Sequence, residues 1–265
     1  MSSSSDPDGT RSSQPLAADA SALLEPGSVQ AQFAAPDGAL VMLRWCEAAV
    51  AVRFEELKPV AAFKAVPGRR WGPGWWWSAT TGGHVVVGSK AMRSQLMILD
   101  RDPRVAGLAG RPVRLIWREP GSRRVRSWVP QLFARYVDGA ALLADCPSRI
   151  GAGGERAAQA AAVMAEVCAQ VGFVYRRLAP VDEVLAVNLV WLAGYRHPRN
   201  AGGPLLVQAL QEAFVEPLPL LEGAARVGDA LTVLPSVFHA LWSGRLAADL
   251  SAPLHERVTV WAVAG

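Results

Sequence analysis

The sequence predicts an α/β protein with a mixed central β-sheet flanked by helices. Three observations lead to this prediction. The chain has 265 residues, of which 51% are hydrophobic, so it has ample apolar material for a packed core. From residue 85 onward, helical and strand periodicities follow in the order helix, β-meander, helix, strand, helix. From residue 204 onward the pattern is mainly helical, which indicates a small, winged-helix-like C-terminal module.

The N-terminal part divides into a tail and a β region. Residues 1–26 are rich in Ser, Asp, Ala and Pro without periodicity, and we expect a disordered tail. Residues 27–66 form the β region. There, Ser28–Phe33 and Ala39–Arg44 alternate around a Pro-Asp-Gly turn, which is typical of a β-hairpin. Ala48–Phe54 predicts a further strand.

Residues 67–203 are the expected α/β core. Its elements, in order, are a helix at Ser89–Leu99, a strand at Arg111–Trp117, strands at Trp128–Tyr136 and Ala140–Ala144, a helix at Glu155–Val171, a strand at Phe173–Leu178 and a helix at Val184–Leu192. Residues 204–265 are the C-terminal helical module. Its elements are a helix at Leu205–Phe214, a short helix or turn at Gly228–Leu234, a helix at Pro235–Ser243, and strands at Gly244–Ala248 and Arg257–Val263.

The compartment follows from what the sequence lacks. Its three cysteines, Cys46, Cys146 and Cys168, are widely spaced and form no CxxC, so we expect neither disulfides nor a zinc site. The N-terminus has no basic and apolar signal segment, and apolar runs are too short to cross a bilayer. We therefore expect a cytoplasmic protein with no metal, no cofactor and no membrane contact.

The net charge of +4 hides a strongly basic middle. Residues 1–40 carry net −4, residues 41–135 carry net +11, and residues 136–265 carry net −3. Only three of the 27 basic residues are lysine. Because the guanidinium group of arginine binds phosphate through two hydrogen bonds and stacks on aromatic rings, this composition favours DNA as a partner. Genome composition accounts equally well for the arginine bias, but less well for the clustering.

A run of tryptophan, glycine and arginine lies inside this basic middle. Residues 67–84 read PGRRWGPGWWWSATTGGH. Interleaved basic and aromatic side chains stack bases or grip a nucleic-acid backbone. The alternative is that the tryptophans fill a small core under a glycine-rich loop.

Five stretches, following one another in the chain, carry a family resemblance: WWWSATTGGHVVVGSKAMRSQLMILDRDPRV, VPQLFARYVDG, VGFVYRRL, VLAVNLVWLAGYRHPR and LPSVFHALWSGRLAADLSAPL. Together they resemble the TnsA-type endonuclease subunit of heteromeric transposases, from about residue 48 to residue 260. The resemblance implies a restriction-endonuclease-like core of the PD-(D/E)xK type. It also implies three partners, namely DNA, a DDE transposase and an AAA+ regulator.

Nucleases of this type hold a divalent metal with acids on the first helix, an Asp after Pro, and an acid–x–Lys on the next strand. Here the resemblance places Gly88 and Met92 at the two helix acids and Gln131 at the Asp. Glutamine lacks the negative charge that holds Mg²⁺. The catalytic set is therefore degenerate on these elements.

The third segment, ALLADCPSRI, fits the family pattern in two registers. In one register, Ala144 stands at the acid and Cys146 at the lysine. In the other, Asp145 is a remnant acid and Pro147 replaces the lysine. Neither register supplies the basic residue that orients water and steadies the phosphorus.

Three functions remain open. The first is a non-catalytic pseudo-endonuclease that binds DNA, a transposase-type partner, or both. The second is an active Mg²⁺-dependent endonuclease with a rearranged site, and the third is a purely protein-interacting or regulatory subunit. The residues expected to contact DNA are Arg69, Arg70, Trp75, Trp76, Lys90, Arg93, Arg123, Arg124, Arg126, Arg196 and Arg199.

Overall fold

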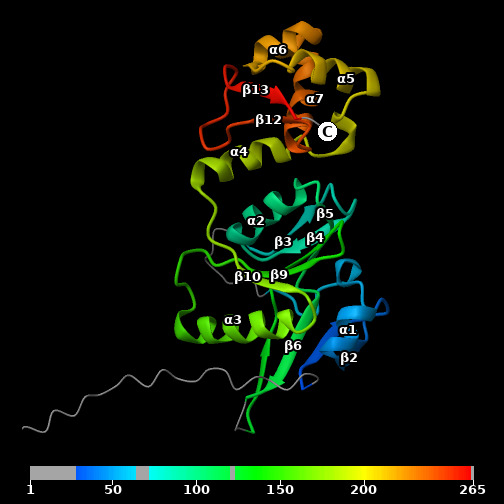
Figure 1. Cartoon of the computed structure of the whole chain (residues 1–265), viewed down its shortest axis with the longest axis vertical. Coiled ribbons are helices and arrows are strands. Elements are labelled where there is room, and N and C mark those ends of the chain that lie inside the picture. The colour runs from blue at the N-terminus through cyan, green and yellow to red at the C-terminus, as the bar shows by residue number, and fades with distance from the viewer. Residues whose placement is uncertain (1–27, 64–71, 120–122, 264–265) are drawn as a thin grey trace, which may run out of the picture.

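The computed structural model describes residues 28–63, 72–119 and 123–263. Over these ranges the chain is a mixed α/β protein with several small sheets and seven α-helices (Figure 1). The helices are α1 (Trp45–Ala51), α2 (Lys90–Asp100), α3 (Gly154–Ala169), α4 (Glu183–Ala193), α5 (Pro204–Ala213), α6 (Leu220–Val227) and α7 (Ala230–Trp242). The strands are β1 (Gln30–Ala34), β2 (Leu40–Arg44), β3 (Gly74–Trp77), β4 (His84–Val87), β5 (Val105–Gly110), β6 (Val113–Arg118), β7 (Val125–Trp128), β8 (Leu132–Tyr136), β9 (Ala141–Asp145), β10 (Val174–Arg177), β11 (Leu218–Pro219), β12 (Leu246–Ala248) and β13 (Thr259–Ala262).

The central sheet has the strand order β10-β9-β8-β5. Strand β8 runs antiparallel to both β5 and β9, whereas β9 and β10 run parallel. A parallel pair needs a crossover connection, and α3 provides it between β9 and β10. Along the chain, helix α2 comes directly before β5, the first strand of this sheet, and α3 comes between its last two strands, β9 and β10.

Helices α2 and α3 cover opposite faces of this sheet. Because strand side chains alternate, Leu142 lies in the same hydrophobic cluster as Met92 of α2, whereas Leu143 lies in the same cluster as Val167 of α3. These are two separate hydrophobic clusters of buried residues. Ser89 begins α2, and its side chain accepts a hydrogen bond from Met92 N at 3.1 Å, as an N-cap residue does.

A second sheet, β2-β1-β6-β7, packs on the α3 side of the molecule. The β1–β2 hairpin opens it, and Phe33 of β1 pairs with Val113 of β6. Trp45 of α1 is buried in the same cluster, and its Nε1 donates to Val167 O at 2.8 Å. The N-terminal region is thereby joined to α3.

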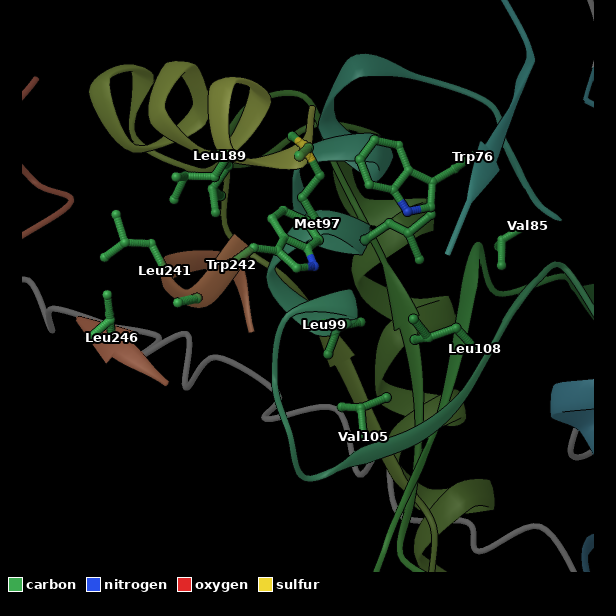
Figure 2. Packing of buried hydrophobic residues seen from close by; sticks show 14 of the residues in the cluster. Trp76, Val85, Met97, Leu99, Val105, Leu108, Leu189, Leu241, Trp242 and Leu246 are labelled. Carbon is green, nitrogen blue, oxygen red and sulfur yellow. The ribbon is translucent and has the colours of Figure 1, made fainter. Parts of the chain in front are cut away.

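The C-terminal helices lie at one end of the molecule, with α4 between them and α2 (Figure 1). One hydrophobic cluster runs from the β3–β4 hairpin and α2 into this region. At its centre the rings of Trp76 and Trp242 lie 6.3 Å apart (Figure 2). Strands β11, β13 and β12 close the C-terminal part as a small sheet. Residues after 204 therefore share their core with the α/β part.

Many expected elements are confirmed. They are the N-terminal hairpin and elements close to α2, β6, β9, α3, β10, α4, α5, β12 and β13. The strand expected at Ala48–Phe54 is wrong, because these residues end α1 and then form a 3-10 turn at Phe54–Glu56. The strand expected at Trp128–Tyr136 is divided between β7 and β8.

The two helical segments expected around Pro235 are one helix, α7, with the proline inside it. A proline inside a helix costs about 3 kcal/mol, and burial of Val233 and Val237 on either side offsets that cost. Strands β3, β4 and β5 and helix α6 lie where no such elements were expected. The tail expected at residues 1–26 lies outside the described residues. In the described ranges, no helix combines the length and apolarity needed to cross a membrane.

Candidate functional site

Strand β9 places the two possible registers of the third nuclease segment on different faces of the sheet. Ala144 and Cys146 belong to the cluster on the α2 face, together with Met92. Asp145 points to the opposite face, where it meets Tyr175 and Trp128 of the other cluster. Only Ala144 and Cys146 therefore lie on the same side as α2, which carries Met92 and is preceded by Gly88.

Asp145 is buried and accepts three hydrogen bonds. Trp128 Nε1 and Tyr175 Oη each donate to Oδ2 at 2.6 Å, and Gln131 N donates to Oδ1 at 3.2 Å. Burial raises the pKa of Asp145, and the bonds from Tyr175 and Trp128 partly oppose that rise. Its carboxylate ties strands β7, β9 and β10 and the start of β8 together, which is a structural role.

Gln131 also serves the backbone. Its Oε1 accepts from Cys146 N at 2.6 Å, and its backbone N–H donates to Ala144 O at 2.9 Å and to Asp145 Oδ1 at 3.2 Å. The amide thus fastens the start of β8 to the end of β9. At this position the resemblance expects a metal-binding aspartate.

Gly88 is covered by an aromatic ring. A Cβ atom at residue 88 would lie 2.0 Å from Cδ1 of Phe63, which is far inside van der Waals contact. The guanidinium of Arg111 lies 4.7 Å from the centre of the Phe63 ring, and its Nη1 donates to Ala62 O at 2.9 Å. The ring of Phe63 therefore covers the residues just before α2.

Arg111 is held in an unusual backbone conformation. Across the described ranges it is the only residue other than glycine with a left-handed φ, of +52°. Its N–H donates to Gln131 O at 3.0 Å and its carbonyl accepts from Val60 N at 2.9 Å. Partial burial lowers the pKa of Arg111. Arg111 thus links Val60 to the start of β8.

These positions do not fit a Mg²⁺ ion. Among the residues that the structure describes, no three His, Cys, Asp or Glu side chains lie close enough to hold a metal. The nearest candidate acid, Asp145, faces the other side of the sheet and is already bonded to neutral donors. Proteins usually bind Mg²⁺ through one or two carboxylates, and Gly88, Met92, Gln131, Ala144 and Cys146 supply none.

Four of the expected DNA contacts meet in one cleft. Trp75, Trp76, Arg93 and Arg196 line a cavity of about 330 Å³ between β3, the start of α2 and the end of α4. The other described residues that line it are Gly72, Gly74, Val87, Ser89, Val190, Ala193 and Gly194, and none of them is acidic. We call this cavity the β3–α4 cleft.

The neighbours Trp75 and Trp76 point in opposite directions along β3. Trp76 is 4% exposed, and its Nε1 donates to Asp100 Oδ2 at 2.8 Å. This placement corrects the expectation that Trp76 contacts DNA, because a buried ring offers no face to a base. Trp75 is 69% exposed at the rim of the cleft, where it meets the ring of His84 edge-on.

Two arginines approach the ring of Trp76. The guanidinium carbon of Arg196 lies 4.0 Å from the ring centre, and that of Arg93 lies 5.6 Å away. Arg196 donates from Nε to Trp77 O at 2.7 Å and from Nη1 to Ala193 O at 2.5 Å. Burial lowers the pKa of Arg196, attraction to Asp100 partly opposes that fall, and repulsion from Arg93 adds to it.

The remaining expected DNA contacts do not gather at the cleft. Lys90 is exposed at the first turn of α2, and Arg199 is exposed beyond α4. Arg123, Arg124 and Arg126 are exposed on or beside β7, where Arg126 pairs with Glu119 at 3.4 Å. Arg69 and Arg70 lie outside the described residues.

Sequence reasoning missed Phe63, Arg111 and Asp100. The acid Asp100 closes the apolar helix α2, and a carboxylate in such a position indicates a buried network. It accepts from Trp76 Nε1, Ser78 Oγ and the backbone N–H groups of Ala79 and Thr80. Phe63 and Arg111 carried no signal, because their contact with the start of α2 depends on the folded chain.

Comparison with protein-family models and with curated proteins finds no match for this chain.

Proposed function

We propose that this chain is a non-catalytic, TnsA-like pseudo-endonuclease that binds DNA. The arrangement of its central elements supports the restriction-endonuclease-like part of the proposal. Helix α2, the strand that follows Pro130-Gln131 and the next strand, β9, are brought together as the resemblance requires. The parallel strand β10 then follows through α3.

One observation supports the proposal that this chain does not cleave DNA. Met92, Ala144 and Cys146 lie in a single hydrophobic cluster at positions where metal-dependent cleavage requires carboxylates and a lysine. Each is at most 3% exposed. Such a group stabilises the sheet–helix contact by burying apolar surface, but it offers neither metal ligand nor charge to a phosphate.

The charge distribution supports DNA as the partner. Residues 41–135 carry net +11, and the β3–α4 cleft adds Arg196 from outside that range. Guanidinium groups that line a cleft without acids attract phosphate and hold it bidentately. Contacts of this kind give affinity without sequence preference.

Fluorescence anisotropy with a labelled duplex tests this proposal. Titration at several salt concentrations is expected to give a logarithm of the binding constant that falls linearly with the logarithm of salt concentration. A chain that fails to bind any DNA at about 50 mM salt would refute DNA binding.

A second function, docking to a transposase-type partner, is favoured by an exposed aromatic cluster. Trp191 of α4 is 55% exposed and packs edge-on against Phe238 of α7, whose ring lies 4.8 Å from that of Tyr195. Val187 and Val190 are exposed on the same helix. Exposed aromatic and aliphatic groups of this kind mark protein interfaces.

Co-purification tests the docking function. The bait is the full chain and the prey is a co-expressed DDE transposase or AAA+ regulator. Trp191→Ser is expected to weaken capture, because it removes an anchor from the interface centre. Deletion of residues 204–265 is unsuitable, because those residues share a core with α2. Equal capture by the wild type and Trp191→Ser would contradict docking through α4.

A further inference from the structure

The β3–α4 cleft is suited to an anion. Arg93 and Arg196 both line it, and none of the described residues that line it is acidic. Arg196 donates to two neutral carbonyl groups, so these bonds do not neutralise its positive charge, which is attracted to Asp100 outside the lining of the cleft. A phosphate between two guanidinium groups would relieve their mutual repulsion and accept charge-assisted hydrogen bonds.

Asp100, the acid that attracts Arg196, already accepts hydrogen bonds from other groups. Asp100 accepts from Trp76 Nε1, Ser78 Oγ and two backbone N–H groups, so both carboxylate oxygens are occupied. It bonds to the edge of Trp76, whereas Arg196 lies over the face of that ring. Asp100 therefore orients the tryptophan that supports the arginines and does not close the cleft to an anion.

Trp75 adds an aromatic face at the rim of the same cleft. Strand alternation turns it outward, because Trp76 beside it is anchored in the core. An exposed indole is costly in water and is an effective stacking platform for a nucleic-acid base. Trp75 thus offers a stacking surface at the rim of a cleft whose arginines can bind phosphate.

The size of the cleft separates single strands from duplexes. Its volume of about 330 Å³ is near the lower end of ligand cavities, which run from about 300 to about 1,000 Å³. That is room for one nucleotide, whereas the major groove of a duplex alone is about 12 Å wide. Stacking on Trp75 also requires a base that is free of its partner.

We infer that the β3–α4 cleft binds an unpaired nucleotide of single-stranded DNA, with its base on Trp75 and its phosphate on Arg93 and Arg196. This inference rests on the proposed function and deepens it, because it selects unpaired over paired DNA. An unpaired flap or strand end is then the part of a DNA substrate that this chain recognises.

Anisotropy with two matched probes tests the inference. The probes are a fluorescein-labelled single strand of about 12 nucleotides and the blunt duplex of the same sequence. The wild type is expected to bind the single strand more tightly. Trp75→Ala should weaken single-strand binding by about 5- to 150-fold and leave duplex binding nearly unchanged. Trp75→Phe keeps a stacking face and should restore most of the loss.

The control variant is Trp261→Ala, which removes a partly exposed tryptophan from β13 outside the cleft. It is expected to bind both probes like the wild type. Arg93→Gln should weaken single-strand binding and reduce its dependence on salt. Circular dichroism of each variant establishes that the fold is intact.

The outcomes separate this inference from the proposed function. Duplex binding without a preference for the single strand, or equal single-strand binding by Trp75→Ala and Trp261→Ala, overturns the inference alone. A wild-type chain that binds neither probe overturns both.

Discussion

The ring of Phe63 occupies the space that a side chain at Gly88 would need. A Cβ atom there would lie 2.0 Å from Phe63 Cδ1 and 2.3 Å from Cε1. The ring cannot withdraw freely, because the guanidinium of Arg111 lies over it at 4.7 Å. At the position where the TnsA resemblance expects a metal-binding acid, the chain thus has a glycine covered by an aromatic ring.

Substitution of Gly88 should therefore cost stability. Gly88→Ala is expected to lower the free energy of unfolding by about 1–3 kcal/mol, because overpacking displaces Phe63. Gly83→Ala is the matched control, since its Cβ would meet only ordinary contacts at 3.9 Å. Its effect should stay within about 0.5 kcal/mol. Urea denaturation measures the free energy of unfolding of both variants. Equal losses would show that the Phe63 ring moves aside at little cost.

The same contact predicts coupling between the two positions. In a Phe63→Ala background, Gly88→Ala should cost less than it does in the wild type, because the clashing ring is gone. A double-mutant cycle by urea denaturation gives the coupling energy. Additive losses would mean that Phe63 is not what restricts residue 88.

The buried carboxyl of Asp145 predicts a pH dependence of stability. Burial raises its folded-state pKa above the ordinary value of 3.8, so the folded protein binds this proton more tightly than the unfolded chain. Below pH 3.8 this tighter proton binding contributes fully to the stability of the fold, and the contribution is lost as the pH rises through the raised pKa of Asp145. The Asp145→Asn variant has no titrating carboxyl at this position and therefore lacks this pH-dependent contribution to stability. The stability difference, wild type minus variant, should therefore fall as the pH rises.

Chemical denaturation between about pH 4 and pH 7 measures this difference. A control substitution is Asp138→Asn, which changes an exposed carboxyl in the β8–β9 turn. A stability difference for Asp145→Asn that grows with pH would mean that the hydrogen bonds from Trp128 and Tyr175 outweigh burial.

The carboxylate of Asp100 should matter for stability through its four donors. Asp100→Asn keeps one carbonyl oxygen but turns an NH₂ group toward N–H or O–H donors, as at Trp76 and Ser78. We expect a loss of about 1–3 kcal/mol in the free energy of unfolding, measured by urea denaturation. Asp138→Asn again serves for comparison. If Asp100→Asn and Asp138→Asn lowered the free energy of unfolding equally, the hydrogen bonds of Asp100 would not be important for the contact between β3 and α2.

The sequence predicted elements whose signals are local. Ser89 capping α2 and the alternation of β1 and β2 needed no tertiary information. Strand β5 was missed because its residues, VAGLAG, are mostly small and carry no β-branched or aromatic pattern beyond Val105. Helix α1 was read as a strand because Ala48–Phe54 alternates, although Trp45 anchors it as a helix.

The candidate site was predictable in its residue types but not in its geometry. Trp75, Arg93 and Arg196 were expected to contact DNA, yet their convergence in one cleft depends on how β3 meets α4. The two registers of β9 differ by one residue, and a shift of one residue moves every side chain to the other face. That Ala144 shares a hydrophobic cluster with Met92, whereas Asp145 faces the other cluster, follows only from the folded chain.

The central claim, that this chain holds DNA without cutting it, is tested most directly by one incubation analysed on two gels. End-labelled single-stranded and duplex DNA are mixed with the wild-type protein and Mg²⁺ or Mn²⁺, then run on native and denaturing gels in parallel. We predict that the native gel shows retarded DNA and the denaturing gel shows full-length strands. Metal-dependent cleavage products, or DNA that is never retarded at low salt, would contradict the claim.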